Sequence, residues 1–411
     1  MPDVVPTASA HQIDTISGGI TAPAGFRAAG VSCGIKSSGL DLALLVADGT
    51  ASAAGLFTTN LAQAAPVVLC RDHLVRSGGC TTAVVVNSGC ANACTGPVGF
   101  EVARRTAELV AQHLGCAAEH VLVASTGVIG VTLDFEKISK GASAAFDGLR
   151  RDGGHDAALA IMTTDVSPKE TAVRLRTSNG AFHVGGMAKG AGMIEPMMAT
   201  MLAFITCDAR VAPTVLHRAL TEVVAETFNA ITVDGECSTN DSVVALASGQ
   251  SGVEIDERQY PVLVDGLRTV CRYLAVEIVR GGEGATKLVT IRVSGATSIA
   301  DARRAARTIA NSPLVKTAIH GGDPNWGRLV AAAGRSGVPF DLDRAAVTIG
   351  PVILFQNGRP FDEAAPEAAN YLRGNDVTVE VDLGTGGAHR ATMWTCDFSA
   401  EYVRINADYR T

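Results

Sequence analysis

Short apolar runs bounded by turn residues recur along the chain and predict buried strands. They occupy residues 42–47, 66–70, 83–87, 121–124, 230–233 and 288–293. Alternating apolar and polar residues predict half-exposed antiparallel strands. Runs of this second kind occupy residues 346–355, 377–382 and 390–394.

Apolar residues at helical spacing predict helices between these strands. The helices are expected at residues 100–114, 214–229, 259–279 and 299–310. Gly115 follows the first of them at a natural C-cap position, and Pro213 stands just before the second. The mixture of strands and helices predicts an α/β protein.

Composition adds a size and a class to this pattern. With 411 residues, the chain exceeds one ordinary core, so one large domain or two closely packed domains are expected. Hydrophobic residues make up 47% of the chain and charged residues 18%, and 44 residues are glycine. These values are typical of a folded, glycine-rich α/β protein and exclude a disordered one.

Charge and hydropathy exclude two classes of partner. The net charge is −7 and no cluster of Lys and Arg is visible, so nucleic acid is not expected as a partner. Residues 1–20 lack the pattern of a signal peptide, and no apolar run reaches the length of about 18 residues that a membrane helix needs. A cytoplasmic protein without a membrane partner is therefore predicted.

Cysteines and acidic residues do not form a predicted metal site. Ten cysteines are scattered, mostly in apolar segments, as expected of reduced thiols in the cytoplasm. Cys90 and Cys94 have no second pair of ligands nearby, so their spacing does not indicate zinc. Residues 234–241 combine acids, hydroxyls and an amide but lack the order of a calcium loop. We expect this loop to position catalytic groups through hydrogen bonds.

A candidate nucleophile, Thr200, lies in the stretch 185–208, between Ala199 and an apolar run. A hydroxyl needs an adjacent base, and a threonine that begins a chain can use its own α-amine, whose pKa is about 8. Cleavage of the Ala199–Thr200 bond would create that amine. The alternative is an ordinary strand threonine whose hydroxyl bonds to the backbone, and the residue pattern leaves both interpretations open.

Three other positions carry candidate chemistry beside ordinary alternatives. Thr126 and Gly127 follow the run 121–124, where a hydroxyl and backbone amides could converge on an oxyanion or simply form a polar turn. Glu283 follows two glycines, a setting in which a glutamate is usually solvated. His320 stands near Asp323, but no triad order is evident, so a framework role is favoured.

Separate blocks of the chain resemble motifs of the ornithine acetyltransferases, the N-terminal-nucleophile enzymes of the arginine pathway. The blocks follow one another in the same order as in that family. The block around the candidate nucleophile comprises residues 189–194, 196 and 199–202. The others are residues 87–89 with 91–96, 125–130, 161–165, 238–241, 282–284 with 286–287, 311–328 and 402–411. The resemblance thus covers nearly the whole chain.

This resemblance implies a role for individual residues. Thr200 matches the nucleophile, Thr126 and Gly127 match the oxyanion-hole pair, and cleavage falls between Ala199 and Thr200. The positions that match substrate-binding residues are Thr163, Lys189, Thr200, Glu283, Asn406 and Thr411.

The resemblance also implies a fold and an assembly. The fold would be an α/β (α+β) sandwich of mixed sheets and helices, ornithine acetyltransferase/DmpA-like, self-cleaved into two intertwined chains. The alpha chain, residues 1–199, would carry the oxyanion hole and binding residues, and the beta chain, residues 200–411, would begin with the nucleophile. A heterotetramer of two alpha and two beta chains is implied.

The implied reaction moves acetyl from N2-acetyl-L-ornithine to L-glutamate through acetyl-Thr200, giving L-ornithine and N-acetyl-L-glutamate. Neither a metal nor an organic cofactor is implied, and acetyl-CoA as a further acetyl donor is left open. One alternative is a related amidohydrolase or aminopeptidase, and another is acyl exchange in specialised metabolism. A phosphate-binding protein is disfavoured, because Lys189 precedes its glycines, in the reverse order of a P-loop.

Overall fold

The computed structural model describes residues 12–195 and 201–408, which divide into two compact units. Within these residues, the larger unit comprises 12–229 and 236–278, and the smaller unit comprises 230–235 and 279–408. The predicted cleavage site, Ala199–Thr200, lies outside the described residues, as does Thr411. The division into alpha and beta chains therefore stays a prediction.

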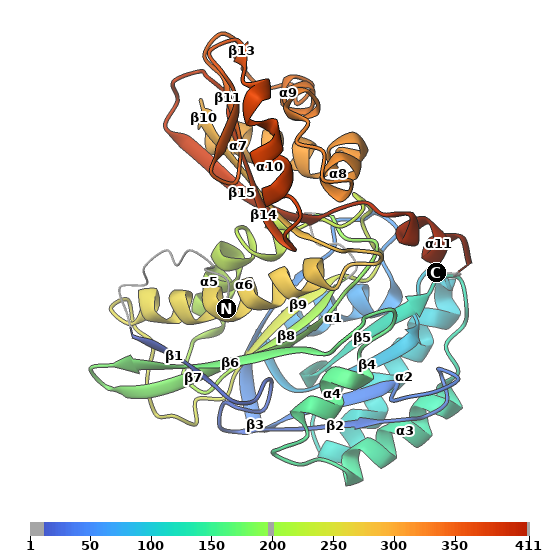
Figure 1. The fold of residues 1–411 in the computed structure, drawn as a ribbon. Coiled ribbons are helices and arrows are strands. Elements are labelled where there is room, and N and C mark those ends of the chain that lie inside the picture. Colours follow the sequence, from blue (N-terminus) through green and yellow to red (C-terminus); the bar gives the residue numbers. More distant parts are fainter. Residues whose placement is uncertain (1–11, 196–200, 409–411) are drawn as a thin grey trace. The chain divides into compact units, whose positions relative to one another are not determined.

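The larger unit is built on a nine-stranded sheet in the order β1-β6-β7-β8-β9-β3-β4-β5, with β2 also paired to β3 (Figure 1). The first four strands are β1 (Ile13–Ile16), β2 (Phe26–Val31), β3 (Leu42–Phe57) and β4 (Cys80–Cys90). The others are β5 (Val121–Val128), β6 (Lys169–Thr177), β7 (Gly180–Lys189), β8 (Leu202–Cys207) and β9 (Ser242–Ala247). The sheet is mixed, because β4–β5 and β8–β9 are parallel pairs whereas the other neighbours are antiparallel.

The long strand β3 joins two parts of this sheet. Its residues 42–46 pair with β2 and β4, and after a register shift residues 52–57 pair with β9. Successive side chains of a strand point to opposite faces. Accordingly, Leu45 enters a core shared with β7, β8 and β9, whereas Leu44 enters a second core beneath the helices.

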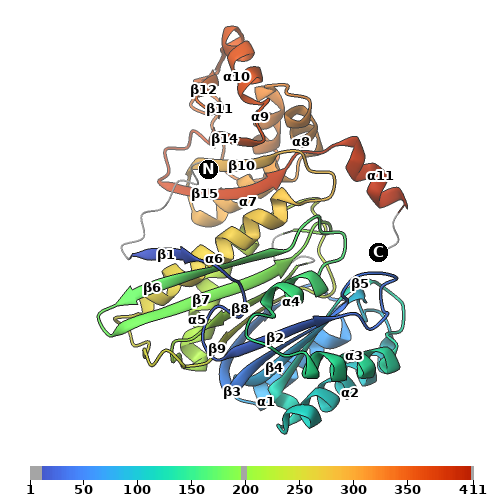
Figure 2. The ribbon, with the colours of Figure 1, turned by 60° about the horizontal axis from the view of Figure 1, so that its bottom comes forward.

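Helices cover the sheet of the larger unit. They are α1 (Ala65–Arg76), α2 (Gly96–Leu114), α3 (Phe135–Asp147), α4 (Gly154–Ala160), α5 (Pro213–Val224) and α6 (Tyr260–Arg280), with 3-10 turns at Ala118–His120 and Phe228–Ala230. Helices α2 and α3 pack on the part that contains β3, β4 and β5 (Figure 2). Helix α6 lies against β7, where Gly186 allows close approach of Val270 and Leu274. Sheets layered with helices confirm the predicted fold class.

The smaller unit has a six-stranded sheet in the order β13-β12-β11-β14-β10-β15. Its strands are β10 (Leu288–Ala296), β11 (Ala346–Ile349), β12 (Val352–Gln356), β13 (Arg359–Pro360), β14 (Asp376–Asp382) and β15 (His389–Cys396). Its helices are α7 (Ile299–Ala310), α8 (Pro313–His320), α9 (Trp326–Gly334), α10 (Ala365–Tyr371) and α11 (Ala400–Asp408), with a 3-10 turn at Asp362–Ala364. The unit has its own apolar core between sheet and helices.

Two predicted strands are wrong. Residues 66–70 lie in the first turns of α1, where Pro66 occupies an early helical position that favours it. Residues 230–233 form no strand: a 3-10 turn ends at Ala230, and Ile231 makes only an isolated bridge to Trp394. Apart from Val68, which is 44% exposed, the residues of both runs are buried. A short apolar run does not distinguish a strand from other buried backbone.

Other predicted bounds need smaller corrections. Helix α2 ends as predicted at Gly115, whose φ of 65° is left-handed, and α6 and α7 match their predicted ranges closely. Helix α5 ends at Val224, earlier than expected. The run 346–355 is two antiparallel strands rather than one. The run 377–382, predicted to be antiparallel, lies in strand β14, which is parallel to β10.

The other global expectations concern thiols and membrane spans. None of the ten cysteines, all of which lie in the described ranges, forms a disulfide, and five of them are buried. Over the described ranges, no helix combines the length and apolarity needed to cross a membrane.

Candidate active site

Lys189 is placed by the pairing of β7 with β8. It is the last residue of β7 and lies opposite Leu202, the first residue of β8, in the antiparallel ladder. The described chain resumes at Met201, so β8 begins two residues after the predicted nucleophile. Strand pairing therefore brings the Lys189 backbone beside the segment that follows Thr200.

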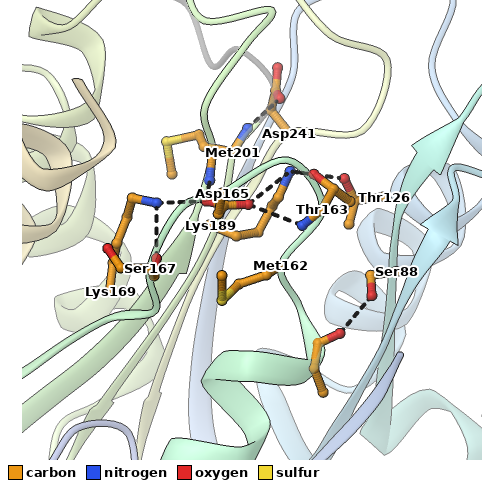
Figure 3. Close-up of polar contacts among 12 residues, drawn as sticks. Ser88, Thr126, Met162, Thr163, Asp165, Ser167, Lys169, Lys189, Met201 and Asp241 are labelled. Atoms are coloured by element: carbon orange, nitrogen blue, oxygen red, sulfur yellow. Dashed lines mark hydrogen bonds and ion pairs between the residues drawn. The ribbon is translucent and has the colours of Figure 1, made fainter. Parts of the chain in front are cut away.

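Three of the predicted site residues converge in the larger unit (Figure 3). The Lys189 ammonium donates hydrogen bonds to the hydroxyl oxygen of Thr163 at 2.8 Å and to that of Thr126 at 3.3 Å. Thr126 comes from β5, and Thr163 comes from the loop between α4 and β6. Lys189 and Thr126 are each only 2% exposed. A buried cation with two hydroxyls suits a carboxylate or a developing oxyanion.

Asp165 sets the charge of this cluster, although the sequence reasoning gave it no role. Its Oδ1 lies 2.6 Å from the Lys169 ammonium and its Oδ2 lies 3.9 Å from the Lys189 ammonium. The side chain of Asp165 is fully buried. It also accepts hydrogen bonds from the backbone N–H of Thr163 and of Gly190. Lys169 and Lys189, each at one end of a strand, are the signal that could have indicated a buried acid, because buried charges are normally paired.

The surroundings lower the pKa of Asp165. Burial alone would raise the pKa of this carboxyl, but the charges of Lys189 and Lys169 and the hydrogen bonds lower it to about 2. Asp165 is therefore an anion at neutral pH. The ammonium groups of Lys169 and Lys189 and the carboxylate of Asp165 together carry a net positive charge. This charge favours an anionic group nearby.

The backbone at Thr126–Gly127 requires glycine. Gly127 has a φ of 129°, and a Cβ there would lie 2.3 Å from the carbonyl carbon of Gly89, its partner on the parallel strand β4. Asn240 fixes the same region from the loop before β9, because its amide donates to the carbonyl oxygens of Ser125 at 2.8 Å and of Ala91 at 2.6 Å. Asn240 of the loop 234–241 thus holds the backbone just before Thr126, and the positioning of catalytic groups by this loop stays a prediction.

Glu283 and Asn406 are brought together in the smaller unit. The Asn406 amide, on α11, donates to Glu283 Oε2 at 2.9 Å. Glu283 is 8% exposed, so it is not the solvated glutamate that its sequence setting suggests. This pair supplies a carboxylate whose orientation is fixed by an amide.

His320 is paired differently from the arrangement considered in the sequence. Its Nδ1 lies 2.6 Å from Asp397, not from Asp323. Asp397 also accepts from the backbone N–H groups of Thr286 and Lys287. Burial would raise the pKa of Asp397, but these hydrogen bonds lower it overall. The group ties α8, β10 and β15 together, which is a framework arrangement.

Comparison with known proteins gives matches over almost the whole chain. The model of the ArgJ family matches residues 27–411. The arginine biosynthesis bifunctional protein ArgJ of Parasynechococcus marenigrum is 47% identical, covering 96% of each chain. That of Gloeobacter violaceus is 49% identical, covering 96% of this chain and 98% of its own.

Solved structures also match parts of the chain. A crystal structure of arginine biosynthesis bifunctional protein ArgJ from Bacillus halodurans is 40% identical, covers 50% of this chain and 98% of that chain, and has a TM-score of 0.49. The family model and the curated relatives confirm the family and the class of enzyme predicted from the sequence, an acyltransferase of arginine biosynthesis. The chain belongs to the ArgJ family.

Proposed function

We propose that this enzyme transfers acetyl from N2-acetyl-L-ornithine to L-glutamate through an acetyl-Thr200 intermediate. The observation that carries the proposal is the buried cluster of Lys189, Thr126 and Thr163 beside the start of β8, the strand that follows Thr200. Family membership supplies the reaction class, and the cluster supplies groups suited to a carboxylate and an oxyanion.

The proposed first step makes the nucleophile. The Thr200 hydroxyl attacks the carbonyl carbon of Ala199 and the peptide C–N bond breaks, which leaves an ester and a free α-amine on Thr200. Water then hydrolyses that ester and releases the alpha chain. The new α-amine has an ordinary pKa of about 8, so it can act as the base for its own hydroxyl near neutral pH.

Two matched half-reactions follow in this proposal. The Thr200 hydroxyl attacks the acetyl carbonyl carbon of N2-acetyl-L-ornithine. The hydroxyl proton passes to the α-amine of Thr200 and then to N2 of the leaving ornithine. The α-amine of glutamate attacks the acetyl ester in turn, and its proton returns to the Thr200 system. The Thr126 hydroxyl and the Gly127 N–H stabilise the oxyanion in both steps.

Substrate recognition follows from charge. Both amino acids carry an α-carboxylate, which suits the net positive cluster around Lys189 and Thr163. Glu283, held by Asn406, offers a carboxylate for an ammonium group of the substrate. Thr411 completes the set of binding residues by its place in the family motif.

Cofactor, assembly and location are part of the same proposal. The chemistry uses only the side chains and the N-terminal amine of the protein, so it needs neither a metal nor an organic cofactor. Acetyl-CoA would serve as a second acetyl donor to the same hydroxyl. The cleaved chains form a heterotetramer of two alpha and two beta chains in the cytoplasm.

The test of this function is the fate of the acetyl group. Purified protein is incubated with N2-acetyl-L-ornithine carrying a labelled acetyl group, with and without L-glutamate, and products are identified by mass spectrometry. Labelled N-acetyl-L-glutamate together with a labelled peptide beginning at Thr200 is expected. Labelled acetate at the same rate with or without glutamate would instead make the protein a hydrolase. Replacing the donor by acetyl-CoA tests the second activity.

Gly127→Ala is expected to lower kcat by roughly 10²–10³-fold, the cost of losing one oxyanion donor. The added Cβ would clash with the Gly89 backbone and a φ of 129° is strained for alanine, so the 126–127 backbone must move. Gly130→Ala is the matched control, because Gly130 also has a positive φ, 78°, but has open space around the added carbon. Equal kcat values for the two variants would contradict this placement of the oxyanion site.

A further inference from the structure

Asp241 precedes β9 as Met201 precedes β8. Each immediately precedes the first paired residue of two neighbouring parallel strands, Leu202 and Ser242. Asp241 Oδ1 accepts a hydrogen bond from the Met201 backbone N–H at 3.0 Å (Figure 3). That nitrogen belongs to the peptide bond between Thr200 and Met201. Asp241 is therefore bonded to the first peptide group after the proposed nucleophile.

The Asp241 carboxyl is fully buried and only partly satisfied. The residue is 0% exposed, and its backbone carbonyl is fixed by the N–H of Thr58 at 3.0 Å. Its second carboxyl oxygen, Oδ2, has no hydrogen-bond partner among the residues that the structure describes. An ionised carboxylate in this setting would be costly, because buried charges need full pairing.

We propose that Asp241 is a positioning residue that holds the Thr200–Met201 peptide through the Met201 N–H as an uncharged carboxylic acid. This inference rests on the proposed function, because it concerns the same nucleophile. It differs from an ordinary strand-end hydrogen bond in one respect: the charge state of Asp241 matters to the chemistry at residue 200.

The charge matters because of a short covalent path. Only the Cα and carbonyl carbon of Thr200 separate its α-nitrogen from the Met201 nitrogen that Asp241 binds. A negative charge at Asp241 would stabilise the protonated α-amine and raise its pKa, which would remove the base near neutral pH. An uncharged acid keeps the hydrogen bond without that effect.

The ionisable surroundings agree with an uncharged acid. Burial raises the pKa of Asp241 well above its ordinary value, and the Met201 N–H and the charge of Lys189 only partly oppose this. Lys189 itself faces Asp165 at 3.9 Å. Cys237, in the same loop, has a pKa raised by burial and so stays a neutral thiol. The hydroxyls of Thr58 and Ser238 lie near the Asp241 carboxyl and also oppose the rise in its pKa. The Thr58 hydroxyl itself donates to the Ser238 carbonyl oxygen at 2.8 Å.

The test compares Asp241→Asn with Asp241→Ala. Asparagine keeps an oxygen that accepts from the Met201 N–H and has no charge, whereas alanine removes the acceptor. We expect Asp241→Ala to slow both chain cleavage and acetyl transfer by roughly 10–100-fold, the cost of a misplaced reacting group. Asp241→Asn is expected to restore both rates to near the wild-type value. It should also keep the midpoint of the acidic limb of the kcat/KM pH profile.

The control is Asp208→Asn at the opposite end of β8. Asp208 is also buried, and it accepts from the backbone N–H groups of Ala24 and His183. The Asp208→Asn variant should leave the midpoint of the acidic limb of the kcat/KM pH profile unchanged. Loss of cleavage and transfer in both wild type and Asp208→Asn would overturn the proposed function itself.

Two outcomes with an active wild type would overturn only the role of Asp241. If Asp241→Asn moves the midpoint downward by about one pH unit, the native group is an ionised carboxylate acting on the amine. If Asp241→Ala cleaves and transfers like wild type, the hydrogen bond to Met201 does not position the nucleophile. Should Asp241→Ala fail to fold, the midpoint of Asp241→Asn still decides the charge state.

Discussion

The Thr200→Ala variant is expected to remain one polypeptide of 411 residues, whereas the wild type is expected to yield fragments 1–199 and 200–411. Without the hydroxyl, nothing at residue 200 can attack the Ala199 carbonyl, so neither the cleavage nor the acetyl ester forms. Acetyl transfer should fall by roughly 10⁴-fold or more, as when a covalent nucleophile is removed. Intact mass under denaturing conditions reads the cleavage directly.

Two companion variants separate chemistry from folding in this experiment. Thr200→Ser keeps a hydroxyl and should still cleave, which would locate the requirement in the oxygen. Thr206→Val changes a buried threonine of β8, whose hydroxyl donates to the Ile20 carbonyl at 2.7 Å, and should cleave despite lower stability. An uncut wild type that is folded, or a cut Thr200→Ala variant, would refute the mechanism.

The elements that the sequence predicted well are those in which a helical pattern extends over many residues. Helices α6 and α7 show many turns of apolar spacing, so a shift of a residue or two at either end does not change the assignment. The strand prediction for residues 66–70 was wrong because so short an apolar run fits a buried strand and a helix such as α1 equally. Residues 230–233 failed because core burial, not strand pairing, explains their apolar character.

The candidate site was less accessible to sequence reasoning than the fold. Lys189 bonds to partners 26 and 63 residues away in the chain, and no local spacing encodes those contacts. Family motifs gave roles to Lys189, Thr126 and Thr163 but none to Asp165, although Asp165 lies in the matched block 161–165. Asp165 and Asp241 emerge only when burial and hydrogen-bond partners are known, because the surroundings lower the pKa of the carboxyl at one position and raise it at the other.

Asp165→Asn should be the most destabilising of the single substitutions predicted for the buried cluster. It keeps the shape of the side chain but leaves the ammonium groups of Lys169 and Lys189 without their shared carboxylate. Removing one partner of a buried ion pair costs about 3–5 kcal/mol, because the remaining charge stays desolvated. Urea unfolding in the Thr200→Ala background measures this cleanly, since the expected single chain unfolds without dissociating.

The pH dependence of that loss identifies its origin. The pKa of Asp165 falls from an ordinary 3.8 to about 2 on folding, so its stabilising contribution is complete above about pH 4 and is lost as pH falls towards 2. That displacement corresponds to about 2 kcal/mol. The difference in unfolding free energy between the protein with Asp165 and its Asp165→Asn variant should therefore be large at pH 7 and smaller at pH 3. Asp14→Asn, which removes an exposed ion pair with Arg176, should show little change at either pH. A difference equally large at both pH values would mean that lost packing, not the buried charge, explains the effect.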